Sequence, residues 1–407
     1  MFVSSSWLIS LITAHPAFAY VFPHFEVKKM QWRRYHTNAP LRCSSYYSCL
    51  REKSRGGKRE IINSFSQFPN ELYTLTFFLR HCKIKVRRTT CFFENKGGKT
   101  MASSVDYYVL TQLLIDDIYL PSGEHHINQL GGGIYAVAGM RIWSNHVGFC
   151  CAPGPDYEGN YDSWFINNQI EISGGRRDKK CTHARLNYFP DGEREELLLP
   201  DCASHHESQP LISEIPANYK NCKGMYFFKD CEESFWNDLL PFLRSGSSVS
   251  CWEIFGASAC QENRDFIGDV LHDIDLFSFN LTEGKRLTGK SDPVDIVKEL
   301  FKLNAKNVIL RMGAKGALVS SGKQIYLIPA APTNVVDVTG GGNSSTGGLV
   351  TGFCQSDGDI VEAGLCAGIS ASYILQQYGV PPVIDSTLMA DAHQKLNNLR
   401  SHVTQLV

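Results

Sequence analysis

From residue 107 onward, short apolar runs alternate with longer segments in which apolar residues recur at helical spacing. Runs of strand length stand at 107–115, 147–151, 224–228, 249–254, 274–279 and 308–311. Helical spacing is clearest at 294–303 and in 361–378, which is rich in small residues. Near-continuous apolar strands separated by helices predict an α/β fold with a mostly parallel central sheet covered on both faces.

A glycine-rich run at 335–348 carries the strongest chemical signal. It reads Val-Val-Asp-Val-Thr-Gly-Gly-Gly-Asn-Ser-Ser-Thr-Gly-Gly and precedes a short apolar segment, 349–354, that we expect to be helical. Consecutive glycines tolerate positive φ and let backbone N–H groups come close to an anion. A helix that begins there adds its positive end. The run predicts a phosphate site, with a plain turn as the alternative.

Two more segments support nucleotide chemistry. Asn280 and Glu283 follow an apolar run, and an amide oxygen and a carboxylate three apart on a starting helix suit Mg²⁺, which prefers oxygen ligands. The alternative is a helix cap, in which the same side chains bond to backbone N–H groups. Segment 307–319 predicts strand, glycine turn and strand, and Arg311 at its first strand can face phosphates. A plain hairpin explains its glycines equally well.

In this order the segments resemble motifs of the PfkB (ribokinase-like) carbohydrate kinases. Residues 337–343 resemble the signature Asp-x-Thr-Gly-Ala-Gly-Asp, 280–283 resemble Asn-x-x-Glu, and 311–316 resemble Thr-x-Gly-x-x-Gly with Arg in place of Thr. The resemblance covers about 106–383. It implies a kinase domain at 106–400 with a ribokinase-like three-layer sandwich. It also implies a small β lid, expected from about 118–130 and 165–199, where a charged surface insertion is the alternative.

The resemblance also implies roles for individual residues. Gly340, Gly341 and Gly342 are expected to stabilise the transferred phosphoryl group, and Asn343 stands where the family has its catalytic Asp. Asp116, with Asp117 as the other register, corresponds to the Asp that binds substrate hydroxyls at the end of the first strand. Gly132 and Gly133 correspond to the glycine pair that follows, whereas Ala136 stands where a substrate-binding Asn is common. The residues expected to bind ATP and Mg²⁺ are Asn280, Glu283, Arg311, Gly313, Gly316 and Thr339, with Glu283 and Asn280 at the metal.

Two functions follow from the resemblance. The first is an ATP-dependent phosphotransferase that acts on an alcohol group of a sugar or nucleoside-like molecule. The second is a pseudokinase that binds nucleotide or metabolite, because the amide of Asn343 cannot act as a general base, a contribution of about 10²–10⁴ in rate. On this reasoning Asn343→Asp is expected to raise phosphoryl transfer, while Asp337 is expected to fix the turn. A homodimer is a further option.

Charge separates the first hundred residues from the rest. Residues 1–100 hold 17 Lys and Arg against 5 Asp and Glu, whereas the remainder holds 23 against 36. This basic leader allows a secretory signal ending near Ala19, an organelle transit peptide, or translated sequence upstream of a natural start at Met101, which we favour. If Met101 is the start, nucleic-acid binding through the leader is disfavoured.

Cysteine usage indicates the redox state of the compartment, and hydropathy indicates whether a segment is long enough to span a membrane. The 14 cysteines are scattered without a Cys-x-x-Cys motif, and several stand in apolar runs. This usage predicts a reducing compartment, and we expect the cytoplasm. No apolar segment reaches the roughly twenty residues of a membrane span, so no membrane partner is expected.

Overall fold

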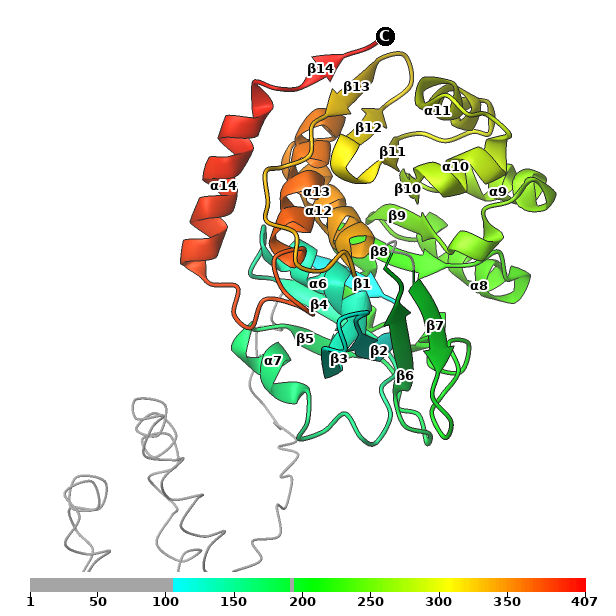
Figure 1. The fold of residues 1–407 in the computed structure, drawn as a ribbon. Coiled ribbons are helices and arrows are strands. Elements are labelled where there is room, and N and C mark those ends of the chain that lie inside the picture. The colour runs from blue at the N-terminus through cyan, green and yellow to red at the C-terminus, as the bar shows by residue number, and fades with distance from the viewer. Residues whose placement is uncertain (1–104, 191–193) are drawn as a thin grey trace, which may run out of the picture. The chain divides into compact units, whose positions relative to one another are not determined.

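The computed structural model describes residues 105–190 and 194–407, and the expectations for the leader at 1–100 lie outside this part. A ten-stranded sheet forms its centre (Figure 1). The strands in spatial order are β14 (Thr404–Gln405), β13 (Ile325–Ile328), β12 (Ala317–Ser320), β11 (Val308–Arg311), β10 (Leu276–Asn280), β9 (Val249–Ile254), β8 (Gly224–Lys229), β1 (Tyr107–Leu110), β4 (Val147–Cys150) and β5 (Glu171–Ser173). Strands from β11 to β5 pair in parallel, and β12, β13 and β14 pair antiparallel at one edge.

Helices cover both faces of this sheet (Figure 1). One face carries α6 (Gly133–Arg141), α12 (Gly341–Gln355), α13 (Ile360–Ile374) and α14 (Ser386–Arg400). The other carries α8 (Glu233–Arg244), α9 (Arg264–Leu271), α10 (Leu281–Thr288) and α11 (Pro293–Lys302). Short helices connect these elements: α7 (Asp162–Asn167) and the 3₁₀ turns η1 (Ile212–Glu214), η2 (Ala217–Asn221), η3 (Gly256–Ser258), η4 (Gln261–Asn263) and η5 (Gly313–Lys315).

Side-chain alternation along the strands explains the two cores. In β1, Tyr107 and Val109 join the apolar cluster under α12 and α13, while Tyr108 and Leu110 join the cluster under α8 and α11. Both faces of a parallel strand are buried, so the run reads as continuously apolar in sequence. The predicted α/β sandwich with a mostly parallel sheet is confirmed.

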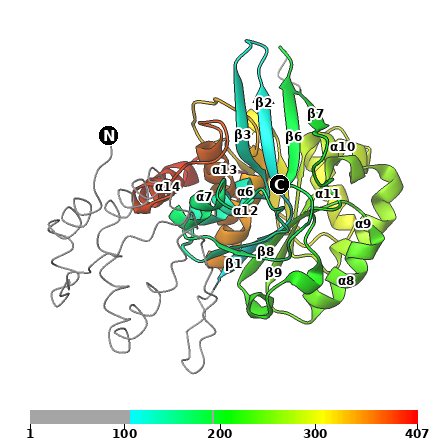
Figure 2. The same ribbon diagram turned by 90° about the horizontal axis from the view of Figure 1, so that it is seen from below.

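A second, smaller sheet stands beside the large one (Figure 2). It has the order β3 (His125–Gly132), β2 (Leu113–Tyr119), β6 (Thr182–Tyr188) and β7 (Arg194–Leu198). Two of its three pairings are antiparallel, and β2 pairs with β6 in parallel. Figure 2 shows its strands rising together away from the large sheet, so the small second sheet expected with the fold class is present.

Two sequence-based boundaries were wrong. The run 107–115 is not one strand: β1 ends at Leu110 and β2 begins at Leu113, so Asp116 lies inside β2 and not at the end of the first strand. The break is only two residues long, and the backbone groups of Thr111 and Gln112 bond to Cys150 and Gly133, which no local sequence signal marks.

The helix expected at 349–354 is α12, which already begins at Gly341. Its glycines weaken intrinsic helix propensity, but packing compensates. A Cβ at Gly347 would collide with the backbone of Ala136, and one at Gly139 would collide with the backbone of Ser344. Small residues therefore allow α6 and α12 to pack backbone to backbone.

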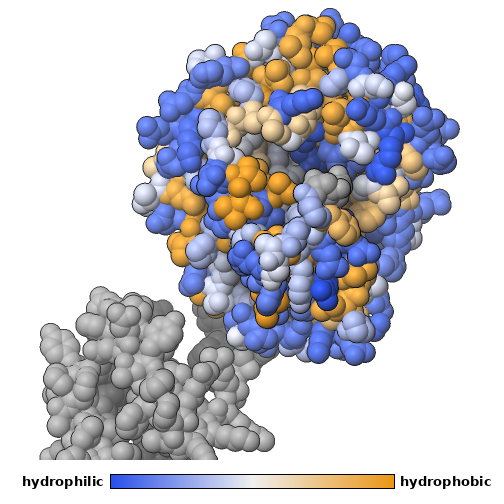
Figure 3. Space-filling model, viewed as in Figure 1, coloured by the Kyte–Doolittle hydropathy of each residue, from blue (hydrophilic) through white to orange (hydrophobic). Residues whose placement is uncertain are grey.

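Across residues 105–190 and 194–407, no helix combines the length and apolar character that crossing a bilayer requires. Figure 3 shows a face on which polar side chains predominate and apolar ones form scattered patches.

Candidate active site

The predicted nucleotide segments converge at one edge of the large sheet. Asn280 and Arg311 are the last residues of β10 and β11 and pair in register. Glu253 lies one residue before the end of β9. Because the carboxyl ends of neighbouring parallel strands share an edge, these side chains meet where α/β sheets usually bind ligands.

The glycine-rich turn sits against this edge and is fixed by Asp337. The Oδ1 atom of Asp337 accepts hydrogen bonds from Thr339 N at 2.9 Å and Thr339 Oγ1 at 2.8 Å, as expected for a turn-fixing residue. Gly340 has φ of 77° and precedes α12, and a Cβ there would overlap the ring of Tyr135. Gly341 N donates to Val338 O at 3.3 Å. The next two N–H groups of α12, those of Gly342 and Asn343, have no acceptor within the helix, so they are available to an anion.

A chain of polar contacts runs under the turn, on the sheet face that α12 covers. Asn343 Nδ2 donates to Tyr226 Oη at 2.9 Å, and Tyr226 Oη donates to Glu253 Oε2 at 3.0 Å. Arg311 Nη1 lies 2.8 Å from Glu253 Oε1. We call these four residues the Asn343–Arg311 chain. A Cβ at Gly342 would fall on Arg311 Nη1, so this glycine leaves room for the guanidinium.

Glu283 forms the helix cap that was the alternative to metal binding. Its Oε2 accepts from Asn280 N at 2.6 Å, and Asn280 Oδ1 accepts from Glu283 N at 2.9 Å. Burial raises the pKa of Glu283, and Arg311, 3.9 Å from Oε2, opposes that rise. Glu283 Oε2 and Asn280 Oδ1 are thus engaged in the cap, which leaves Glu283 Oε1 for a hydrated cation.

The carboxylates of Asp116 and Asp337 face a common buried region with Tyr135. Burial first, and then the nearby Glu196, raise the pKa of Asp116 to about 7. The hydroxyl of Tyr135 and Oδ2 of Asp337 are buried without a hydrogen-bond partner. Unpaired buried polar atoms are costly, so this region suits a ligand rich in hydroxyl groups.

The glycines of 131–133 shape the same region. A Cβ at Gly131 would fall on the Asp116 carboxylate, and Gly132, with φ of 61°, turns the chain from β3 into α6. A Cβ at Gly133 would collide with Thr111. Asp117 points elsewhere: its Oδ1 lies 3.1 Å from His183 Nε2, so the structure favours Asp116 over this alternative.

The small sheet touches the glycine turn through Tyr188 and Arg194. Tyr188 Oη donates to Asp337 Oδ1 at 3.0 Å and lies 2.5 Å from Thr339 Oγ1. Arg194 Nη1 donates to Thr339 Oγ1 at 3.0 Å. Thr339, expected at the nucleotide, is therefore occupied by contacts with β6 and β7.

Removing one of these contacts should loosen the small sheet. We expect Arg194→Ala to speed amide hydrogen exchange in β6 and β7 by about tenfold, the equivalent of one charged hydrogen bond. Arg185→Ala is the matched control. Arg185 stacks on Tyr119 within the same sheet, with its Cζ atom 3.8 Å from the centre of the ring. Equal acceleration in both variants would contradict a contact specific to the turn.

Sequence reasoning missed several members of this site, namely Tyr135, Tyr188, Arg194, Tyr226 and Glu253. Glu253 had a usable signal, because a carboxylate inside an apolar strand needs a partner. Tyr188 and Arg194 had none, since their contacts with the turn cross about 145 positions of sequence or more. Gly313 and Gly316 have φ of 60° and 84° and form the tight turn between β11 and β12 that was predicted.

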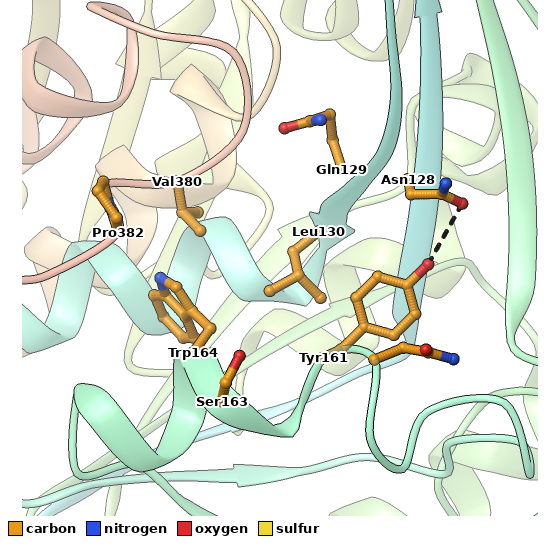
Figure 4. Close-up of a pocket in the computed structure, with 9 residues that line it drawn as sticks. Asn128, Gln129, Leu130, Tyr161, Ser163, Trp164, Val380 and Pro382 are labelled. Carbon is orange, nitrogen blue, oxygen red and sulfur yellow. Dashed lines mark hydrogen bonds between the residues drawn. The ribbon is translucent and has the colours of Figure 1, made fainter. Parts of the chain in front are cut away.

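A separate pocket opens beside the small sheet (Figure 4). Figure 4 shows Leu130 and Gln129 of β3 opposite Trp164 and Val380, and Asn128 bonded to Tyr161. None of the residues predicted for the site lines it. Within the described part of the chain, no group of three or more His, Cys, Asp or Glu side chains could hold a metal.

Comparison with known proteins agrees with this architecture. The pfkB family carbohydrate kinase profile matches residues 253–386. A cytidine kinase of Thermococcus kodakarensis is 25% identical over 260 residues, which cover 62% of this chain and 89% of that protein. The match over residues 253–386 confirms the resemblance predicted from the motifs.

Solved structures share the ribokinase-like fold. Adenosine kinase from Sinorhizobium meliloti has a TM-score of 0.59 at 15% identity and covers 72% of this chain and 99% of its own. Fructokinase from Vibrio cholerae O395, in a form that binds fructose, ADP and calcium ion, has a TM-score of 0.56 at 16% identity. It covers 70% of this chain and 99% of its own.

Proposed function

We propose that the protein transfers the γ-phosphoryl group of ATP to a hydroxyl of a sugar or nucleoside-like molecule. One observation carries this proposal: buried, unpartnered oxygens of Tyr135 and Asp337 lie beside the start of α12, where the N–H groups of Gly342 and Asn343 have no acceptor in the helix. The first group suits an acceptor with several hydroxyls, and the second suits phosphate. Fructokinase from Vibrio cholerae O395, which shares the fold, has a form that binds fructose, ADP and calcium ion.

The residues take distinct tasks in this proposal. Asp116 and Asp337 accept hydrogen bonds from substrate hydroxyls and orient the acceptor. The N–H group of Gly342 stabilises charge on the phosphoryl group as it moves, whereas Gly341 N donates to Val338 O at 3.3 Å. Asn343 holds the attacking hydroxyl, and the residues of 106–400, with the small sheet as a lid, form the kinase domain.

Asn280, Glu283 and the turn at Gly313 and Gly316 fit a bound Mg²⁺–ATP. Glu283 keeps one carboxylate oxygen outside its cap, next to strand ends that carry Arg311. Mg²⁺ binds nucleotide phosphates with few protein ligands and several waters, which agrees with a single suitable carboxylate. When bound, Mg²⁺ would neutralise negative charge on the phosphates.

Turnover distinguishes this proposal from a nucleotide-binding pseudokinase. Thermal shift with Mg²⁺–ATP, followed by ADP release with a panel of sugars and nucleosides, tests both. Release of ADP that depends on one acceptor supports the kinase. Binding of ATP without transfer to any member of the panel favours the pseudokinase.

Glu283→Gln tests the metal assignment. The change keeps the shape of the side chain but removes one anionic oxygen. The factor by which Mg²⁺ raises the affinity for ATP should therefore fall by about tenfold or more, the effect of losing one charge-assisted hydrogen bond. Isothermal titration with and without Mg²⁺ measures it. Asn280→Asp is the companion variant, since it keeps the capping oxygen and adds charge. If Glu283→Gln lowers only thermal stability, Glu283 is a cap alone.

A further inference from the structure

The direction of the hydrogen bonds in the Asn343–Arg311 chain is fixed by chemistry. A carboxylate only accepts, so the single proton of the Tyr226 hydroxyl goes to Glu253 Oε2, 3.0 Å away. The hydroxyl oxygen must then accept from Asn343, and only Nδ2 of the amide can donate, at 2.9 Å. The amide oxygen of Asn343 therefore points away from Tyr226.

The charged end of the chain holds this direction in place. Arg311 keeps its positive charge and forms an ion pair with Glu253, Nη1 lying 2.8 Å from Oε1. Tyr226 is fully buried, and burial together with Glu253 raises its pKa well above the ordinary value. Tyr226 thus keeps its proton near neutral pH.

We propose that Tyr226, Glu253 and Arg311 are positioning residues that present the Oδ1 atom of Asn343 to the acceptor hydroxyl. Among the described residues, no group hydrogen-bonds to that Oδ1, and Asn343 is only half-buried at the start of α12. This inference rests on the proposed kinase function. Asn343 is then a hydrogen-bond acceptor that its neighbours hold in position, and not the remnant of a lost catalytic base.

The chemical step does not require a stronger base. The acceptor oxygen forms its bond to the γ-phosphorus while the bond to the bridging oxygen of ADP breaks. In a loose transition state the hydroxyl keeps its proton until late, and the proton then passes to an oxygen of the transferred phosphoryl group. Orientation by Asn343 Oδ1 is sufficient for this sequence.

The chain also changes the expectation for Asn343→Asp. A carboxylate at this position cannot donate to Tyr226, so two carboxylates would compete for one hydroxyl proton. Adding Glu253→Gln resolves the conflict. The Gln amide oxygen still accepts from Arg311, its amide nitrogen donates to Tyr226, and Tyr226 turns its proton toward position 343.

A double-mutant cycle on the full chain without nucleotide tests this coupling. At pH 8 we expect Asn343→Asp to lower Tm by about 2 °C or more, and Glu253→Gln to recover most of that loss in the double variant. The deficit of Asn343→Asp should shrink as pH falls toward 5. A carboxylate whose folded pKa is raised destabilises only where it is ionised, and the penalty is lost on protonation.

Glu283→Gln in the same Asn343→Asp background is the matched control. It removes a carboxylate from the other side of Arg311, 3.9 Å away, without touching Tyr226. Recovery with Glu253→Gln and none with Glu283→Gln supports the chain. Additive effects of Asn343→Asp and Glu253→Gln would overturn it.

Kinetics separate the positioning role from the proposed function. Tyr226→Phe frees the Asn343 amide, so kcat for the alcohol acceptor should fall about tenfold or more with ATP affinity unchanged. An unchanged kcat would overturn the positioning role. If the parent protein binds Mg²⁺–ATP but phosphorylates nothing, the kinase proposal fails, whereas the stability cycle still decides whether the chain exists.

Discussion

Gly342→Ala is expected to destabilise the protein by about 3 kcal/mol, the lower range for breaking a buried ion pair. The added Cβ would occupy the position of Arg311 Nη1 and lie 3.3 Å from Glu253 Oε1. The guanidinium must move, and the buried Glu253 carboxylate then loses its charged partner. Chemical denaturation measures the change in the free energy of unfolding.

Gly341→Ala is the matched control one residue earlier in the same turn. Its Cβ would meet only the end of the Leu375 side chain, at 2.9 Å, which can rotate away. Replacing a helical Gly by Ala also gains up to about 1 kcal/mol in propensity. We therefore expect a change within about 1 kcal/mol. Similar losses of unfolding free energy in both variants would show that the destabilisation comes from the turn itself and not from displacement of Arg311.

These contacts show where sequence reasoning succeeded and where it stopped. The parallel strands, the glycine turn and the cap-forming pair Asn280 and Glu283 were all visible, because each rests on residues close together in sequence. Arg311 was placed near the nucleotide from its motif alone. Its contact with Glu253 could not be predicted, since it depends on the order of β9, β10 and β11 in the sheet.

The acceptor side was harder to predict for a related reason. Asp116 was predicted for the acceptor side through the resemblance, but its strand was misplaced because two short buried strands follow one another with no Gly or Pro between them. Tyr188 and Arg194 reach the turn only because β6 and β7 belong to the second sheet. Pairing between distant strands, which local patterns do not encode, therefore determines which residues meet at the proposed acceptor site.

Asp116→Asn is expected to stabilise the fold and to impair catalysis. The pKa of Asp116 is raised from 3.8 to about 7, so the ionised form is disfavoured in the folded state. The penalty is fully present above pH 7 and vanishes below about pH 4, where the carboxyl is protonated in both states. Removing the charge should therefore raise the free energy of unfolding by roughly 2–4 kcal/mol at pH 8, with a smaller gain at pH 5.

The same substitution should lower kcat/KM for the acceptor by about 10–100-fold, because a charge-assisted hydrogen bond is worth roughly 1.5–3 kcal/mol. Asp117→Asn is the control in the next position of β2. Its carboxylate accepts from Asn128 N at 2.8 Å and pairs with His183, so its loss should give no stability gain. A stability gain with no loss of transfer at Asp116 would mean that this buried carboxylate does not bind the acceptor. A gain in stability together with a loss of phosphoryl transfer would indicate that the Asp116 carboxylate is retained for function at the expense of stability.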